Sequence, residues 1–79
     1  MTPNSFDLLT CKEALGDGYV RTLETKARTD AENGVYNLGH SPPTSYWDGV
    51  KQHMESVVYS VAFKQRIDRL ERMKTTNAN

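Results

Sequence analysis

The stretch that decides the fold covers residues 46–73 and reads YWDGVKQHMESVVYSVAFKQRIDRLERM. Projected at about 100° per residue, as in an α-helix, its apolar side chains form two stripes on nearly opposite sides. One stripe belongs mainly to the first half of this helix and the other to the second half. The first stripe contains Trp47, Val50, Met54, Val57, Val58 and Val61, and the second contains Tyr59, Phe63, Ile67, Leu70 and Met73.

Two stripes require two covering surfaces, because a single partner helix covers only one of them. We expect the first half of the helix to pack against an earlier helix of the same chain. The second half then needs another surface, and the simplest supplier is the same helix of a second copy, which gives a helical-bundle homodimer. A foreign protein would serve equally well.

An earlier helix is predicted over residues 10–33. Thr10 and Glu13 form a capping box, which is typical of a helix start. An apolar residue then recurs every four positions, and Asn33-Gly34 is a suitable end because glycine tolerates the left-handed conformation. The weak point is residues 16–18, Gly-Asp-Gly. Either the helix is kinked there, or it begins at Asp17 and residues 5–15 form a separate turn.

Residues 34–45 are predicted to be a loop, stiffened by Pro42 and Pro43. Its apolar side chains are expected to fold back over the open end of the hairpin. Ser45 and Asp48 suit the start of the second helix. The sequence therefore predicts one all-α domain over residues 1–79, a two-helix hairpin with an arm at 1–9, helices at 10–33 and 46–73 and a tail at 74–79. A strand at residues 57–61 is the structural alternative, because that stretch has high β propensity.

The composition gives a second reason to expect a partner. The chain has 79 residues, of which 37% are apolar, below the usual share for a globular domain. A chain this short gains only about 3–5 kcal/mol from its core and usually needs reinforcement. Cys11 is the only cysteine, so no internal disulfide can form, and two scattered histidines do not make a structural zinc site. Oligomerisation or docking on another protein is the remaining way for the chain to gain this stability.

Net charge and hydropathy argue against further classes of protein, namely nucleic-acid-binding, membrane-spanning and secreted proteins. Ten basic and ten acidic residues cancel, so the chain lacks the broad positive field that drives nucleic-acid binding. No apolar run approaches the roughly 20 residues that a bilayer span needs, and residues 1–5 lack the features of a signal peptide. We expect a cytoplasmic protein that does not act on membranes.

The sequence offers little catalytic chemistry. Cys11, His40 and His53 are not brought together by any recognisable motif, and most carboxylates are spread along an exposed helix face. Phosphate-binding loops, nucleophile elbows and zinc-binding motifs are missing. We predict no catalytic residue, no cofactor and no metal, and a protein that is not an enzyme.

In its layout of helix, aromatic and proline-containing loop, and helix, the chain resembles the small ribosome-modulating proteins of bacteria. The similarity is carried by Gly18-Tyr19 and by residues 46–49, Tyr-Trp-Asp-Gly. Those proteins are markedly basic, as binding to ribosomal RNA demands, whereas this chain is neutral. We therefore assign no family and do not transfer their function.

The function expected from the sequence is that of a small regulator or inhibitor that binds another protein, itself, or both. Such proteins are frequent among the products of phages and mobile elements. The alternative is a nucleic-acid-binding accessory protein, because residues 64–74 hold five basic and two acidic residues. The residues predicted to bind a partner are Val35, Tyr36, Leu38, Tyr46, Tyr59, Phe63, Ile67 and Leu70, and those for nucleic acid are Lys64, Arg66, Arg69 and Arg72.

Overall fold

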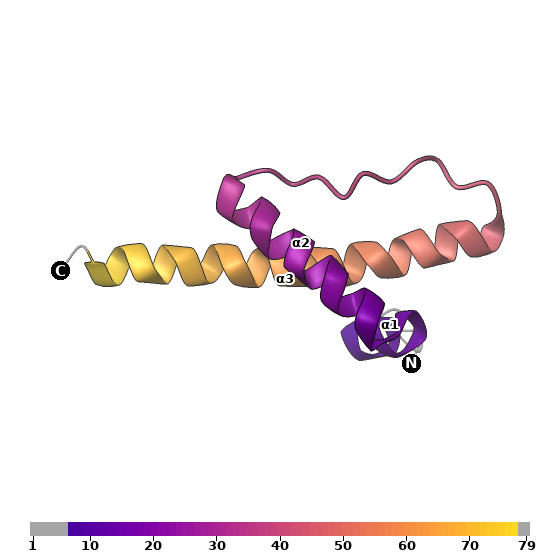
Figure 1. Ribbon diagram of the computed structural model, residues 1–79, viewed down its shortest axis with the longest axis horizontal. Coiled ribbons are helices and arrows are strands. Elements are labelled where there is room, and N and C mark those ends of the chain that lie inside the picture. The colour runs from indigo at the N-terminus through magenta and orange to yellow at the C-terminus, as the bar shows by residue number, and fades with distance from the viewer. Residues whose placement is uncertain (1–6, 78–79) are drawn as a thin grey trace, which may run out of the picture.

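The computed structural model describes residues 7–77, with the side chains of residues 7–73, and every regular element in that range is a helix. Helix α1 spans Leu8–Leu15, α2 spans Asp17–Asn33 and α3 spans Tyr46–Asn77. Helix α2 crosses the middle of α3, and the connecting loop runs back along α3 to its first turn (Figure 1). The molecule is elongated, with extents of 50 × 31 × 22 Å. The prediction of an all-α chain is confirmed, and residues 57–61 are helical rather than a strand.

The first of the two predicted helices is in fact two helices, separated at Gly16. The backbone of Gly16 has φ +90°, a conformation that side chains disfavour and that interrupts the helix. Helix α1 begins at Leu8, where the Asp7 carboxylate accepts a hydrogen bond of 2.8 Å from the Thr10 N–H. The capping-box pattern had indicated Thr10 as the cap of this helix. Thr10 instead lies inside α1. The structure lies closer to the alternative in which a new helix begins at Asp17.

The end of α2 and the start of α3 lie where the sequence places them. Gly34 is left-handed, with φ +73°, and its N–H donates to the Ala31 carbonyl at the end of α2. At the start of α3, the Ser45 hydroxyl accepts from the Asp48 N–H at 3.1 Å. Helix α3 continues to Asn77, beyond the predicted end at Met73. Residues 1–6 of the predicted arm and 78–79 of the predicted tail lie outside the described residues.

Small side chains allow α2 and α3 to approach closely where they cross. Ala27 is 0% exposed and lies with the buried Ala62 and Tyr59 in one core cluster. Val58, from the other stripe of α3, lies in a second cluster with Cys11, Val20 and Leu23. Both stripes of α3 are thus covered in its middle, within one copy of the chain. This corrects the expectation that the second stripe as a whole needs an external surface.

The loop is the additional cover that the helical pattern did not reveal. Leu38 packs against both core clusters, as expected for an apolar loop residue that folds back. The ring of Tyr36 meets the rings of Tyr59 and Phe63 edge-on, each at a centroid distance of 5.1 Å. Tyr59 and the half-buried Phe63 therefore lie beneath the loop, and residues 34–45 do for them what a second copy was expected to do.

The crossing of α2 and α3 predicts a cost for any larger side chain at Ala27. We expect Ala27→Leu to lower the free energy of unfolding by about 1–3 kcal/mol, because its extra carbons must displace Tyr59 or Ala62. Thr25→Leu, at an exposed position of α2, is the matched control and should change stability much less. Urea unfolding followed by circular dichroism measures both, and equal stability of the two variants would contradict the close crossing.

Candidate partner-binding surfaces

A buried carboxylate joins the loop to the helices. Glu55 of α3 is 6% exposed and accepts hydrogen bonds from the Tyr19 hydroxyl of α2 and from His40 Nε2 of the loop, the latter at 2.5 Å. The Lys51 ammonium lies 3.9 Å from the same carboxylate. Burial of a carboxylate is tolerated because its oxygens have partners. We call this group the Glu55 clasp, and it gives His40 a structural partner that the sequence did not indicate.

A second polar group, the Tyr59 clasp, fixes the start of the loop. The buried Tyr59 hydroxyl donates to Asp30 of α2 and accepts from the Asn37 N–H at 3.1 Å. The Lys26 ammonium bridges the Asp30 carboxylate and the Asn37 carbonyl, each at 2.9 Å. The hydrogen bonds from Tyr59 and Lys26 hold the pKa of Asp30 below its ordinary value. In both clasps the carboxylate accepts a hydrogen bond from a tyrosine of another helix, and each clasp ties the loop to the helices.

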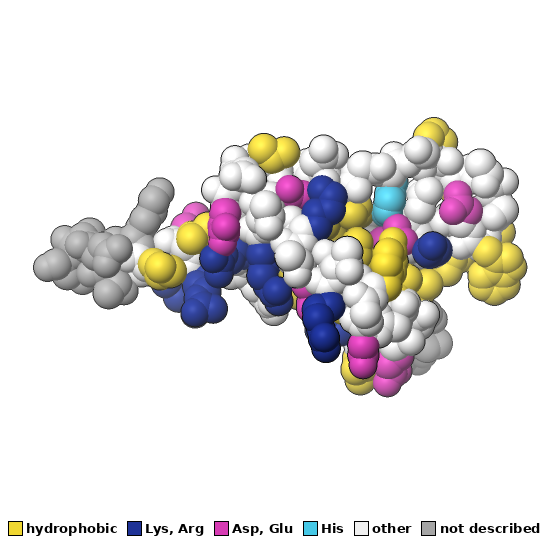
Figure 2. All heavy atoms as spheres, in the orientation of Figure 1, with side chains coloured by type: hydrophobic (Ala, Val, Ile, Leu, Met, Phe, Trp, Pro, Cys, Tyr) yellow, Lys and Arg dark blue, Asp and Glu magenta, His cyan; other side chains and the backbone are white. Residues whose placement is uncertain are grey.

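The first turn of α3 presents the most exposed aromatic pair of the described chain. Tyr46 is 76% and Trp47 75% exposed, and their rings meet edge-on with centroids 5.3 Å apart. Hydrophobic side chains gather over these first turns (Figure 2). The prediction that Trp47 begins the core stripe is therefore wrong. The reason is that the start of α3 projects past α2, which crosses it further along (Figure 1).

Beside this pair lies an apolar groove between the α1–α2 junction and α3. It has a volume of about 410 Å³, and Lys51 is its one charged lining side chain. We call it the aromatic groove. It is lined by Ala14, Leu15, Tyr19, Trp47, Val50, Lys51 and Met54.

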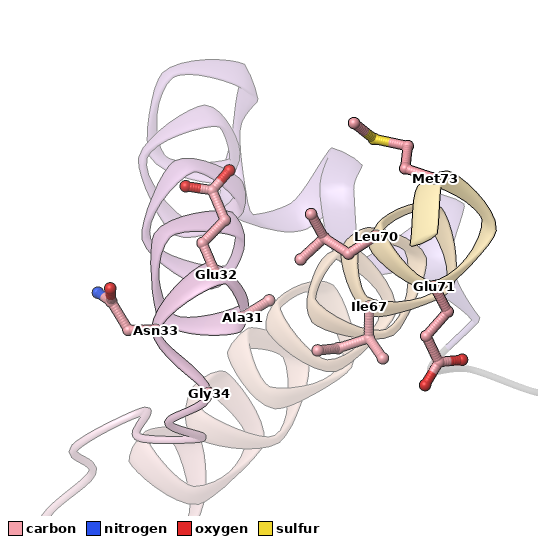
Figure 3. A pocket seen from close by; sticks show the side chains of 8 residues that line it. All are labelled: Ala31, Glu32, Asn33, Gly34, Ile67, Leu70, Glu71 and Met73. Carbon is pink, nitrogen blue, oxygen red and sulfur yellow. The ribbon is translucent and has the colours of Figure 1, made fainter. Parts of the chain in front are cut away.

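A second hollow lies at the other overhanging end of α3, and we call it the C-terminal notch. Its volume is about 570 Å³. Ile67 and Leu70 project from α3 on the side of Ala31, near the end of α2, and Met73 lies one turn further on (Figure 3). The C-terminal notch is lined mainly by apolar side chains, and the carboxylates of Glu32 and Glu71 lie at its edge. It is lined by Ala31, Glu32, Asn33, Gly34, Ile67, Leu70, Glu71 and Met73.

The structure does not bring the sequence-predicted partner residues into one surface. Val35 and Tyr36 are 50% and 57% exposed at the start of the loop, whereas Tyr46 lies at its far end. Tyr59 is 0% exposed and so is inside the molecule. Ile67 and Leu70 remain accessible, in the C-terminal notch. Trp47 is a surface residue that the sequence pattern had assigned to the core, although its place in the first turn of a long helix pointed to exposure.

The four residues predicted to bind nucleic acid also differ in exposure. Lys64, Arg69 and Arg72 are exposed, and Lys and Arg side chains gather over the C-terminal half of α3 (Figure 2). Arg66 is half-buried and ion-paired with Glu32 of α2. Asp68 shares a shallow hollow with Arg69 and Arg72. The basic side of α3 is therefore interrupted by a carboxylate, and one of its four cations is engaged within the chain.

The described residues assemble neither an activated nucleophile nor a cluster of metal ligands. Cys11 is 0% exposed, and burial, together with the Asp7 charge, raises the pKa of its thiol, which opposes thiolate formation. Among residues 7–77, no three histidine, cysteine, aspartate or glutamate side chains lie close enough to hold a metal ion. Over the same residues, no helix is both long and apolar enough to span a bilayer.

Comparison with known proteins assigns no family to the chain. No protein-family model, no curated protein and no solved structure matches it. The function therefore has to be inferred from the geometry of the aromatic groove and of the C-terminal notch.

The exposure of Trp47 predicts a simple spectroscopic result. Trp47 is the single tryptophan, so the intrinsic indole fluorescence of the chain reports on it alone. We expect emission typical of a solvated indole and acrylamide quenching close to that of a free tryptophan amide. Unfolding in urea should change this quenching very little. Strong protection that disappears in urea would place Trp47 in the core, as the sequence pattern had suggested.

The Glu55 clasp predicts a loss of stability at alkaline pH. The hydrogen bond to Glu55, with burial and the Glu55 charge, raises the pKa of Tyr19 from 10.0 to about 12. The folded protein then holds the Tyr19 proton more tightly than the unfolded chain does. This contribution favours folding below pH 10 and is lost as the pH rises from about 10 to 12.

We expect the free energy of unfolding of Tyr19→Phe to fall less between pH 9 and pH 11.5 than that of the unmodified protein. Urea unfolding at the two pH values measures the difference. Tyr46→Phe, at an exposed phenol, is the matched control and should keep the full fall. An identical fall in the unmodified protein and in Tyr19→Phe would contradict the hydrogen bond between Tyr19 and Glu55.

Proposed function

We propose that this protein is a non-enzymatic, cytoplasmic regulator or inhibitor that binds another protein, and that the aromatic groove is its binding surface. The observation that carries the proposal is the exposure of Trp47 beside an apolar groove. Tryptophan and tyrosine dominate the residues that supply binding energy at protein interfaces. A solvent-exposed aromatic pair beside the aromatic groove is suited to binding an apolar side chain of a partner.

The exposed indole can supply a substantial share of the binding free energy. Covering the exposed part of an indole removes roughly 150 Å² of mainly apolar surface from water, worth about 4 kcal/mol at ~25 cal/mol per Å². Val50, Leu15 and Met54 add further apolar surface at the same place. Met54 is unbranched and adapts its shape to a partner more readily than valine or leucine does.

The groove is also held in shape before any partner arrives. One wall, Tyr19, is tied to Glu55, and the Lys51 ammonium lies 5.5 Å from the centre of the Tyr19 ring. The opposite wall is the first turns of α3, whose start is capped by Ser45 and Asp48. A preorganised site loses less conformational entropy on binding.

We propose in addition that the chain assembles as a helical homodimer, through the C-terminal notch. The accessible residues of the second stripe are Ile67, Leu70 and Met73. Tyr59 and Phe63, which the sequence offered for the same role, are covered by the loop of their own chain. The homodimer surface is thus the distal part of α3 and lies at the opposite end from the aromatic groove.

Nucleic-acid binding is the alternative function, and the exposed side chains of Lys64, Arg69 and Arg72 are the observation in its favour. Against it stand the zero net charge of the chain and the Asp68 carboxylate among these cations. Contacts to phosphates would make the affinity fall steeply with salt. Association through the aromatic groove, being mainly apolar, would depend on salt much less.

The groove is tested by comparing matched immobilised variants in an extract of the source organism. We expect Trp47→Ala to retain a specific protein at least ten-fold less than the unmodified chain, and Thr29→Ala, on the exposed side of α2, to retain it equally. The purified partner should shift the Trp47 emission to shorter wavelength. Retention that is unaffected by Trp47→Ala, or that disappears after nuclease treatment, would contradict the proposal.

A further inference from the structure

The last turns of α3 extend past the end of α2 (Figure 1). We propose that this C-terminal arm, residues 64–77, packs antiparallel against the same arm of a second copy, with two symmetric ion pairs between Lys64 and Glu71. The inference rests on the proposed homodimer and specifies its geometry. It commits the C-terminal notch to a second copy of this chain.

The arm needs a covering surface. At about 1.5 Å per residue it is roughly 21 Å long, and its last turns lie beyond the end of α2 (Figure 1). Its apolar side chains are accessible: Met73 is 53% exposed, and Ile67 and Leu70 are only partly buried. Phe63, one turn before Ile67, is the last residue of the stripe that the loop covers, through Tyr36. Helix–helix contact would stabilise the remaining turns.

The spacing of the stripe favours another helix as the cover. Phe63, Ile67 and Leu70 are separated by four and three residues, the spacing at which apolar side chains face a partner in a coiled coil. On a helical projection, Lys64 and Glu71 flank one side of this seam. The other flank holds Met73 and Arg66, and Arg66 already binds Glu32.

Charge favours a second copy as the source of that helix. Residues 64–74 carry five basic and two acidic side chains, a net +3, which leaves five basic and eight acidic, a net −3, for residues 1–63. Glu32, which pairs with Arg66 of its own chain, and Glu71 line the notch, and the last turn of α2, whose C-terminal dipole is negative, contains no basic residue. The negative end of α2 at the notch and the net −3 of residues 1–63 therefore favour a basic amphipathic helix, which is what the arm of another copy supplies.

The same charges favour the antiparallel orientation. It brings each basic arm toward the acidic body of the other copy, whereas a parallel pair would set the two acidic bodies side by side. With Ile67 opposite Leu70 of the second copy, Lys64 falls close to Glu71 of the second copy, and two-fold symmetry repeats the pair. Within one chain these two residues are about 10.5 Å apart along the helix.

The seam is tested by sedimentation velocity on the full chain. We expect a dimer at micromolar concentration, a dissociation constant at least 50-fold higher for Leu70→Glu, and one about three- to ten-fold higher for Met73→Ala, which removes an apolar side chain from the flank of the seam. Met73 lies past α2, so its variant tests the contact even if Leu70→Glu alters the fold, which circular dichroism reports. Gln65→Glu adds the same charge on the exposed face and should leave the dissociation constant within about two-fold.

The orientation is tested by a charge exchange. We expect Lys64→Glu and Glu71→Lys each to weaken the dimer about three- to ten-fold, because each sets like charges opposite one another. The double variant should recover the affinity of the unmodified protein. Failure of this recovery, with the single variants both weakened, would overturn the antiparallel arrangement.

A chain that stays monomeric at 100 µM would overturn the inference altogether, as would a dimer that is lost in Trp47→Ala but kept in Leu70→Glu. The two proposals also fail separately. If the dimer forms as described while Trp47→Ala has no effect on partner retention, only the groove proposal is wrong. If partner retention depends on Trp47 while the chain is monomeric, only the dimer proposal is wrong.

Discussion

Tyr59 is the side chain on which the arrangement of this molecule depends. It is fully buried at the crossing of α2 and α3, where Ala27 and Ala62 leave room for its ring. Its hydroxyl group donates to Asp30 and accepts from the Asn37 N–H, so one phenol joins both helices and the loop. A phenol of this kind combines a large apolar area with a polar end that must find partners when buried. Satisfying both requirements fixes the path of the loop along α3.

The lengths of the two main helices account for the surfaces that remain. Helix α2 has 17 residues and α3 has 32, so α2 and the loop cannot cover the whole of α3. Because the crossing lies near the middle, α3 projects at both ends. The first turn exposes Tyr46 and Trp47, and the last turns expose Met73 beside the notch. Two separate surfaces on one short chain are suited to a protein that joins two binding events.

The buried Glu55 and the half-buried Asp30 serve the architecture. Glu55 and Asp30 each accept a hydrogen bond from a tyrosine hydroxyl. Glu55 also accepts from His40 of the loop. Asp30 binds Lys26, which in turn donates to the Asn37 carbonyl of the loop. Carboxylates satisfied in this way hold segments in place, and breaking either group would leave a poorly solvated charge. The loop is thus held by polar contacts in addition to the packing of Leu38 and Tyr36.

The sequence by itself determined the helical class, the glycine end of α2 and the serine start of α3, because these follow from local chemistry within a few residues. It also revealed that α3 carries more apolar surface than one helix can cover. It could not show that Gly16 divides the first helix, since a glycine can kink a helix or interrupt it. Only the tertiary structure decided which residues are covered, because that depends on where α2 crosses and where the loop runs. Tyr59 and Trp47 both lie on apolar stripes of α3, yet the crossing buries the first and leaves the second in water.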